Sequence, residues 1–136
     1  MFTLDHLGIA VRSLEHARKF YEQLGMHILP AETIEAESVR VAGVVVGDSR
    51  LQLIEARGED SPIGRFVQRR GEGLHHVALR VTDLPRTIEK LKAAGTRFVS
   101  DEIRIGAGNR SYIFVHPSST GGVLLELCEE MPLGVG

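Results

Sequence analysis

Two stretches of this 136-residue chain decide its fold: residues 5–25, DHLGIAVRSLEHARKFYEQLG, and residues 75–95, HHVALRVTDLPRTIEKLKAAG. In each stretch, apolar residues first recur with the period of two that is typical of a β-strand, and then with helical spacing. The chain is therefore predicted to contain the same strand–helix unit twice. Aligned at an offset of 70, the stretches match at His6/His76, Val11/Val81, Leu14/Leu84 and Gly25/Gly95.

Both repeated helices have start and stop signals. The first should begin after Ser13 as N-cap and stop at Gly25. The second should begin after Asp83, tolerate Pro85 in its first turn, and stop at Gly95. Helical spacing predicts that the first helix buries Leu14, Ala17, Tyr21 and Leu24, and that the second buries Leu84, Thr87, Ile88 and Leu91.

Strand-like sequence follows each strand–helix unit. In the first half, Val39–Val46 and Arg50–Glu55 flank a hairpin turn, and a short helix from Ser61 to about Gly71 should then link the halves. In the second half, the predicted strands are Phe98–Ile103, Ser111–His116 and Val123–Cys128. The predicted fold class is α+β: one domain over 1–136, with two paired βαβββ half-modules at about 1–58 and 72–130 and a linking helix at about 61–70.

Composition narrows the function. The chain is 43% hydrophobic and 25% charged, with a formal net charge of −2, so no basic excess indicates nucleic-acid binding. No apolar run is long enough to span a bilayer, and the first residues lack a signal-peptide pattern. The single cysteine, Cys128, cannot form an internal disulfide and is expected to be a small buried hydrophobe. We therefore expect a cytoplasmic protein.

Four polar residues occupy strand positions among apolar neighbours. His6 and His76 are equivalent in the repeat, and Gln52 and Glu126 correspond in the matching segments LQLI and LELC. A single polar residue of this kind is more often a buried structural group with hydrogen-bond partners. Equivalent placement of the residues in the two halves favours a shared site instead. If the halves pair about a pseudo-twofold axis, two imidazoles and two side-chain oxygens meet as an N₂O₂ set for a divalent metal. The residue types suit Co²⁺, Ni²⁺, Mn²⁺, Fe²⁺ or Zn²⁺.

Several short segments, spread over nearly the whole chain, carry a family signature. With them the sequence resembles the vicinal oxygen chelate superfamily, and within it the methylmalonyl-CoA epimerase family. The ligand set alone is typical of the superfamily, whereas the glycine-containing segments favour the epimerases. The segments are Asp5–Val11, Asp60–Ile63, Arg70–His76, Ile105–Gly108, His116-Pro117 and Thr120–Leu127.

The resemblance implies a metal-lined cup built from the paired modules, with His6, Gln52, His76 and Glu126 as metal ligands and Co²⁺ as the favoured ion. It also implies metal-dependent epimerisation of (R)/(S)-methylmalonyl-CoA through a stabilised enolate. Glu126 is the first candidate for the catalytic base, because a ligand carboxylate can swing or share its second oxygen. The expected partners are a small acyl-CoA substrate and a second copy of the chain in a homodimer of about 30 kDa, twice the 14.9 kDa protomer.

Two positions depart from the family pattern. Some epimerases place a glutamate, a candidate second base, where this chain has Val41; Glu35, Glu37 and His116 are the alternatives for that role. Ser118 stands where the family has a lysine. Two other functions remain open: a glyoxalase I type lyase acting on a glutathione hemithioacetal, and a non-catalytic small-molecule binding protein of the same fold.

Overall fold

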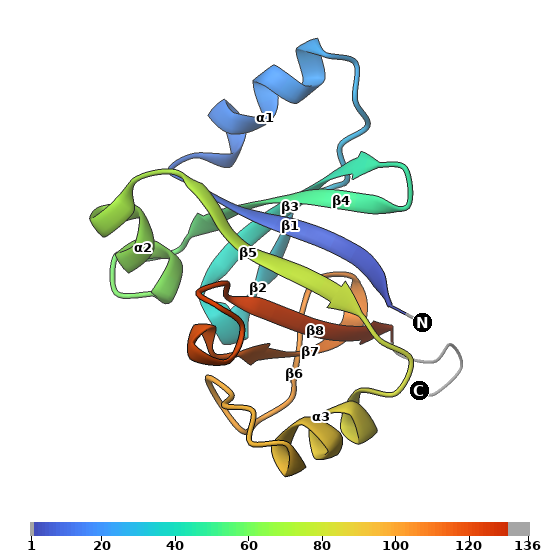
Figure 1. Ribbon diagram of the computed structural model, residues 1–136. Coiled ribbons are helices and arrows are strands. Elements are labelled where there is room, and N and C mark those ends of the chain that lie inside the picture. The colour runs from blue at the N-terminus through green and yellow to red at the C-terminus, as the bar shows by residue number, and fades with distance from the viewer. Residues whose placement is uncertain (1, 131–136) are drawn as a thin grey trace. The chain divides into compact units, whose positions relative to one another are not determined.

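The computed structural model describes residues 2–130 (Figure 1). The chain divides into two compact units: His6–His75 form one, and the residues before and after that range form the other. Both divisions fall inside strands. Each half of the chain has the element order β-α-β-β-β, so the predicted α+β class with two βαβββ modules is confirmed. That these modules make one domain over 1–136 stays a prediction.

The unit of residues 6–75 contains a four-stranded sheet in the order β2-β3-β4-β1. Strand β1 pairs in parallel with β4, and β3 lies antiparallel between β4 and the short β2. The predicted linking helix is confirmed as α2, which Ser61 caps by accepting a hydrogen bond from the Gly64 amide. The elements are β1 (Thr3–Val11), α1 (Leu14–Gln23), β2 (Glu32–Ile34), β3 (Val39–Val46), β4 (Ser49–Ala56) and α2 (Pro62–Arg70), with a 3₁₀ turn at Glu35–Glu37.

The other unit repeats this arrangement in the order β5-β8-β7-β6. Strand β5 pairs in parallel with β8, and β7 lies antiparallel between β8 and β6. The elements are β5 (Gly73–Arg80), α3 (Leu84–Ala93), β6 (Arg104–Ile105), β7 (Arg110–Val115) and β8 (Leu125–Glu130), with 3₁₀ turns at Ala107–Asn109 and Pro117–Ser119.

The predicted helix signals are confirmed. Ser13 accepts a hydrogen bond from the His16 amide, and Asp83 accepts one from the Arg86 amide, so each caps its helix. Gly25 and Gly95 follow the helices with positive φ angles of 87° and 88°. One predicted burial is wrong, because Leu24 is 64% exposed. This residue is the C-cap of α1, past the last residue of the helix, so helical spacing no longer places it on the buried face.

The strand predicted over Phe98–Ile103 is wrong. Phe98 forms only an isolated bridge with Val115, and the outer strand of this unit is the two-residue β6. The polar stretch after Val99 explains the difference, because the Ser100 hydroxyl accepts a hydrogen bond from the Glu102 amide and turns the chain. Similarly, β8 begins two residues later than predicted, since the Thr120 hydroxyl donates to the Val123 carbonyl.

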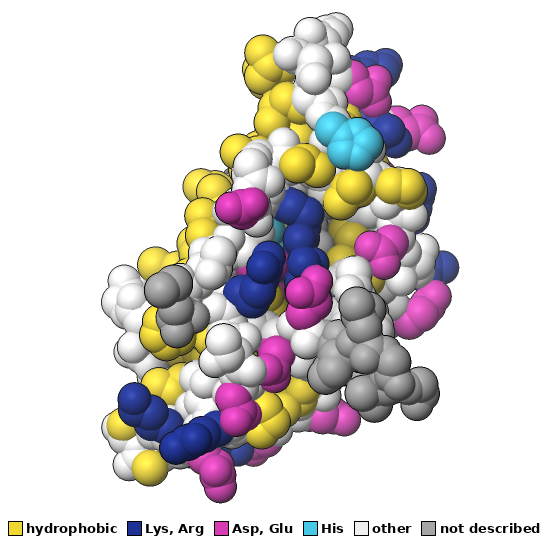
Figure 2. Space-filling view, turned by 90° about the vertical axis from the view of Figure 1, so that its right-hand side faces the viewer, with side chains coloured by type: hydrophobic (Ala, Val, Ile, Leu, Met, Phe, Trp, Pro, Cys, Tyr) yellow, Lys and Arg dark blue, Asp and Glu magenta, His cyan; other side chains and the backbone are white. Residues whose placement is uncertain are grey.

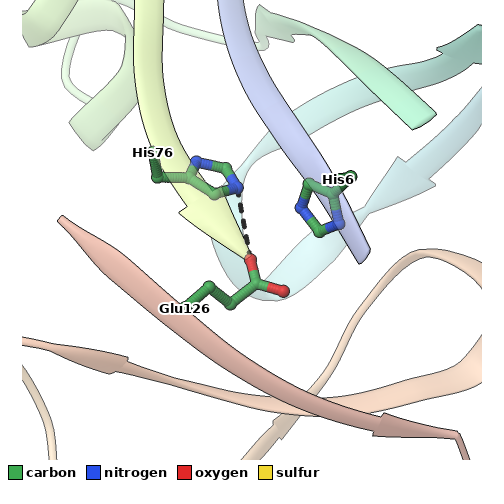
Figure 3. A group of neighbouring side chains, drawn as sticks. All are labelled: His6, His76 and Glu126. Atoms are coloured by element: carbon green, nitrogen blue, oxygen red, sulfur yellow. Dashed lines mark ion pairs between the residues drawn. The ribbon is translucent and has the colours of Figure 1, made fainter. Parts of the chain in front are cut away.

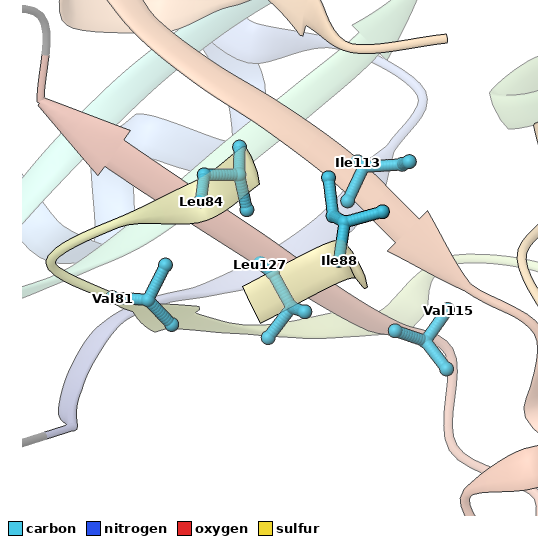
Figure 4. Packing of buried hydrophobic residues seen from close by; sticks show 6 residues of the cluster. All are labelled: Val81, Leu84, Ile88, Ile113, Val115 and Leu127. Carbon is cyan, nitrogen blue, oxygen red and sulfur yellow. The ribbon is translucent and has the colours of Figure 1, made fainter. Parts of the chain in front are cut away.

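Each unit has its own hydrophobic core between its sheet and its repeated helix. In the unit of residues 6–75 the buried cluster is Val11, Leu14, Ala42, Val44 and Leu53. In the other unit, Leu84 and Ile88 of α3 lie against strand residues in the cluster drawn in Figure 4: Val81, Leu84, Ile88, Ile113, Val115 and Leu127. The repeated helices cover one face of each sheet, and the opposite face in the unit of residues 6–75 carries Gln52 together with the buried aliphatic Val41 and Ile54.

The surface charge and the helices agree with the near-neutral, moderately hydrophobic composition. On the face drawn in Figure 2, basic side chains lie beside acidic ones. None of the helices within residues 2–130 is long and apolar enough to cross a membrane.

Candidate metal centre

A buried imidazole–carboxylate pair marks the unit that contains β5 and β8. His76 Nε2 lies 3.3 Å from Glu126 Oε1, and the two side chains are only 4% and 10% exposed (Figure 3). A carboxylate is costly to bury on an otherwise apolar strand unless a partner compensates it. The strand positions that the sequence singled out are therefore brought together in this unit.

The parallel pairing of β5 with β8 positions this pair. Ala78, two residues after His76, lies opposite Glu126 in the register, so the histidine and the glutamate project from the same face of adjoining strands. On the other side of Glu126, its register partner on β7 is Phe114, whose ring meets the His76 ring edge-on at 5.3 Å and 85°. The side chains of His76 and Glu126 are thus flanked by two apolar residues, the small Ala78 and the aromatic Phe114.

The unit of residues 6–75 carries the other two predicted ligands in the same register. Gly8, two residues after His6, lies opposite Gln52 in the parallel β1–β4 pair, as Ala78 lies opposite Glu126. His6 and Gln52 are 3% and 7% exposed, so both are buried polar groups. The duplication seen in the sequence therefore extends to the placement of the four residues on their strands.

Glycines flank Gln52 on both neighbouring strands. Its register partners are Gly8 on β1 and Gly43 on β3, where the second unit has Ala78 and Phe114 beside Glu126. A Cβ at Gly43 would lie 3.1 Å from Arg50 Cδ, so the Arg50 side chain passes over this glycine. The residues opposite Gln52 thus have no side chains of their own, and the side chains of Arg50 and Leu29 occupy the space at Gly43.

Comparison with known proteins assigns the family. A family model described as the glyoxalase/bleomycin resistance protein/dioxygenase superfamily matches residues 5–114. Mitochondrial methylmalonyl-CoA epimerase of Homo sapiens is 37% identical over 126 residues, which are 91% of this chain and 72% of that protein. The crystal structure of methylmalonyl-CoA epimerase from Mycobacterium tuberculosis matches with a TM-score of 0.90 at 37% identity, over 95% of this chain and 88% of that chain. The chain belongs to the methylmalonyl-CoA epimerase family.

A solved member of the epimerase family carries a substrate-like ligand. A variant of the Streptomyces coelicolor methylmalonyl-CoA epimerase, in complex with 2-nitronate-propionyl-CoA, matches this chain with a TM-score of 0.88 at 33% identity. The match covers 95% of this chain and 97% of that chain. The resemblance read from the short sequence segments is thus confirmed at the level of the family.

The position at which some epimerases have a glutamate is apolar in this family member. Val41 lies on β3 opposite Ile54 and is only 5% exposed. Among the alternatives for a second base, Glu35 pairs with Arg57 at 3.1 Å, and His116 Nδ1 accepts a hydrogen bond from the Ser118 amide. Both side chains therefore have structural partners, and His116 caps the turn that follows β7.

Two further buried side chains, Cys128 and Asp5, lie on the strands that carry the site residues. Cys128 is 1% exposed, and burial raises the pKa of its thiol, which fits the expected small hydrophobe rather than a nucleophile. Asp5 is fully buried and pairs with Arg80 and Arg110, a role that the sequence reasoning missed. The signal was present, because strand alternation places this aspartate on the same face as apolar residues.

Proposed function

We propose that this protein is a methylmalonyl-CoA epimerase that interconverts the (R) and (S) epimers at the carbon between the thioester and the carboxylate. The observation that carries the proposal is the duplicated placement of buried ligand-type side chains, His6 with Gln52 and His76 with Glu126, in a chain of the epimerase family. The ethylmalonyl-CoA/methylmalonyl-CoA epimerase of Cereibacter sphaeroides, 33% identical over 127 residues, supports a malonyl-type thioester substrate.

We propose further that His6, Gln52, His76 and Glu126 form one divalent metal site. Two histidines and a glutamate of this set are buried residues that each offer a nitrogen or oxygen ligand atom, and Gln52 adds an amide oxygen. The matched register of the two pairs supports the combination, because Gly8 lies opposite Gln52 as Ala78 lies opposite Glu126. The donor set suits Co²⁺, with Ni²⁺, Mn²⁺, Fe²⁺ or Zn²⁺ as alternatives.

A bound divalent ion would supply Lewis-acid stabilisation of the negative charge that develops on carbonyl oxygens when the acidic proton leaves. Glu126 is the residue proposed to remove that proton. Its carboxylate has two oxygens, and Oε1 faces His76 Nε2 at 3.3 Å, so His76 fixes the direction of the carboxylate. Glu126 is buried beside Ala78 and Phe114, and this burial limits the access of water to the base.

Return of the proton to the opposite face of the carbon requires a second proton donor or a base that moves. Val41 cannot serve, because its side chain is aliphatic. Glu35, Glu37 and His116 stay the candidates, and replacing each in turn by the isosteric or small neutral residue would assign the role.

The direct test of the substrate compares a CoA thioester with a glutathione hemithioacetal. Metal-loaded protein is given one epimer of methylmalonyl-CoA or the methylglyoxal–glutathione hemithioacetal, and products are followed by chiral analysis and by absorbance. The proposal predicts epimerisation of the CoA ester and no turnover of the glutathione adduct. Turnover of the adduct alone would assign a glyoxalase-type lyase, and turnover of neither with tight ligand binding would assign a binding protein.

We also propose a cytoplasmic homodimer, as expected from the sequence. Several large apolar side chains lie at the surface, and Phe2 and Leu74, 68% and 66% exposed, are among the most exposed of them. Light scattering at micromolar concentration should return about 30 kDa, twice the 14.9 kDa chain. A monomer mass under these conditions would contradict the dimer without affecting the proposed reaction.

A further inference from the structure

A fully buried aspartate stands immediately before a proposed metal ligand. Asp5 is 0% exposed, and its Oδ1 accepts hydrogen bonds from Arg80 Nε at 3.0 Å and Arg80 Nη2 at 2.8 Å. Arg110 Nε lies 3.4 Å from the same oxygen, and Arg110 is also paired with Glu130 at 3.7 Å. The hydrogen bond to Asp5 raises the pKa of Arg80, so this guanidinium stays charged. The Asp5 carboxylate thus forms ion pairs with two arginines, Arg80 and Arg110.

Arg80 lies on the strand that carries His76, and Arg110 lies on the strand that pairs with the one carrying Glu126. Arg80 lies on β5, four residues after His76, and its register partner on β8 is Cys128, two residues after Glu126. Arg110 begins β7. The side chain of Asp5 is therefore tied to β5, the strand of His76, and to β7, which pairs with the strand of Glu126. Its own peptide bond leads directly to His6.

Stability alone is a weak explanation for this cluster. Replacing a buried ion pair by apolar residues is often neutral or stabilising, because the charges lose their hydration on burial. The neighbours of Asp5 in the alternation of β1, Leu7 and Ile9, show that this strand accepts aliphatic residues at such positions. An ion pair with directional hydrogen bonds holds the backbone at Asp5 in one position relative to its partner strands. An aliphatic side chain does not.

We propose that Asp5 is a positioning residue for the metal centre: through Arg80 and Arg110 it fixes the backbone at His6, so that the His6 imidazole is presented to the ion together with His76 and Glu126. This inference rests on the metal site of the proposed function. It predicts that loss of the Asp5 carboxylate weakens metal binding even when the fold is retained, because groups that orient a ligand typically change metal affinity 10- to 100-fold.

The test titrates metal-free full-length protein with Co²⁺ and follows both the heat of binding and the visible absorption of the bound ion. Asp5→Asn removes the charge at constant size, and the double variant Asp5→Asn/Arg110→Gln also removes one guanidinium, which restores the charge balance of the cluster. Glu130→Gln is the matched control, because it removes the exposed carboxylate that contacts the same arginine. Circular dichroism and melting temperature report the fold of each variant.

The expected result is Co²⁺ affinity lowered about 10- to 100-fold in both Asp5 variants, with an altered absorption spectrum, and less than a twofold change in Glu130→Gln. A double variant that melts like the wild type and binds Co²⁺ within twofold of it would overturn the positioning role. If neither Asp5 variant folds, Arg80→Lys decides, since it keeps the charge and changes the two-nitrogen contact; unchanged affinity and spectrum there would overturn the role. Wild-type protein that binds no Co²⁺ would instead contradict the metal site itself.

Discussion

Replacing His76 by alanine tests the metal site at a single residue. The change removes one of the proposed nitrogen ligands and leaves the buried Glu126 carboxylate without its imidazole, at a cost of about 1–3 kcal/mol of stability. Calorimetric titration should show Co²⁺ binding lost or weakened at least 100-fold, with the circular dichroism spectrum retained. His116→Ala is the control, because that ring caps a turn, and its Co²⁺ affinity should not change. Unaltered metal content of His76→Ala would remove this residue from the centre.

Cys128 provides a second test at the residue scale. Its sulfur is buried on β8 and lies 3.6 Å from the Leu79 carbonyl, so a thiol reagent cannot reach it in the folded protein. Ellman's reagent at pH 8 should therefore release no colour from native protein and one equivalent after unfolding in guanidinium chloride. Rapid stoichiometric reaction of the native protein would show that β8 is open at this position.

Single residues show what the sequence could predict about the site. Polar side chains are rare in apolar strands, so His6, Gln52, His76 and Glu126 stand out in the sequence. The repeat makes His6 equivalent to His76, which indicates the proposed set of metal ligands. Asp5 was equally conspicuous, yet its partners were not predictable: Arg80 and Arg110 lie 75 and 105 positions away, and only the folded strands show that they reach its carboxylate.

At the scale of elements, helix α2 offers a prediction that runs against helix propensity. Gly64 lies inside this helix, where alanine would normally stabilise by about 1 kcal/mol. A Cβ at Gly64 would, however, lie 2.8 Å from the Glu59 carbonyl oxygen of the preceding loop. Gly64→Ala should therefore lower the free energy of unfolding, by about 1–3 kcal/mol in urea titrations. Gln68→Ala on the exposed side of the same helix should change it little, and a stabilised Gly64→Ala variant would contradict the packing described for α2.

Elements with local signals were predictable, and those defined by pairing were not. Ser13 and Asp83 cap their helices as expected, and the β3–β4 hairpin turns at Gly47-Asp48 because that glycine adopts a φ of 56°. The stretch Phe98–Ile103 has strand-forming residues, but a strand also needs a partner over its length, and the pairing with β7 is limited to the Phe98 bridge and the Val99 amide. Pairing of this kind depends on residues distant in sequence, which local periodicity does not report.

At the scale of the whole molecule, metal binding should stabilise both compact units together. The proposed ligand set takes two residues from each unit, so a bound ion favours the state in which both are folded. Adding Co²⁺ at about 100 times its Kd should stabilise the protein by about 2.7 kcal/mol and raise the melting temperature of a single transition. Removal of the ion by a chelator should reverse the shift. A shift confined to one of two separate transitions would place the ligands within one unit.

The proposed reaction as a whole is tested most directly by proton exchange with the solvent. Co²⁺-loaded protein is incubated with one epimer of methylmalonyl-CoA in deuterium oxide, and the carbon between the two carbonyl groups is followed by NMR and mass spectrometry. The predicted result is racemisation with deuterium entering at that carbon, and loss of both in Glu126→Gln even where the ion stays bound. Wild-type protein that binds Co²⁺ and the CoA ester, yet neither racemises it nor introduces deuterium, would contradict the epimerase function.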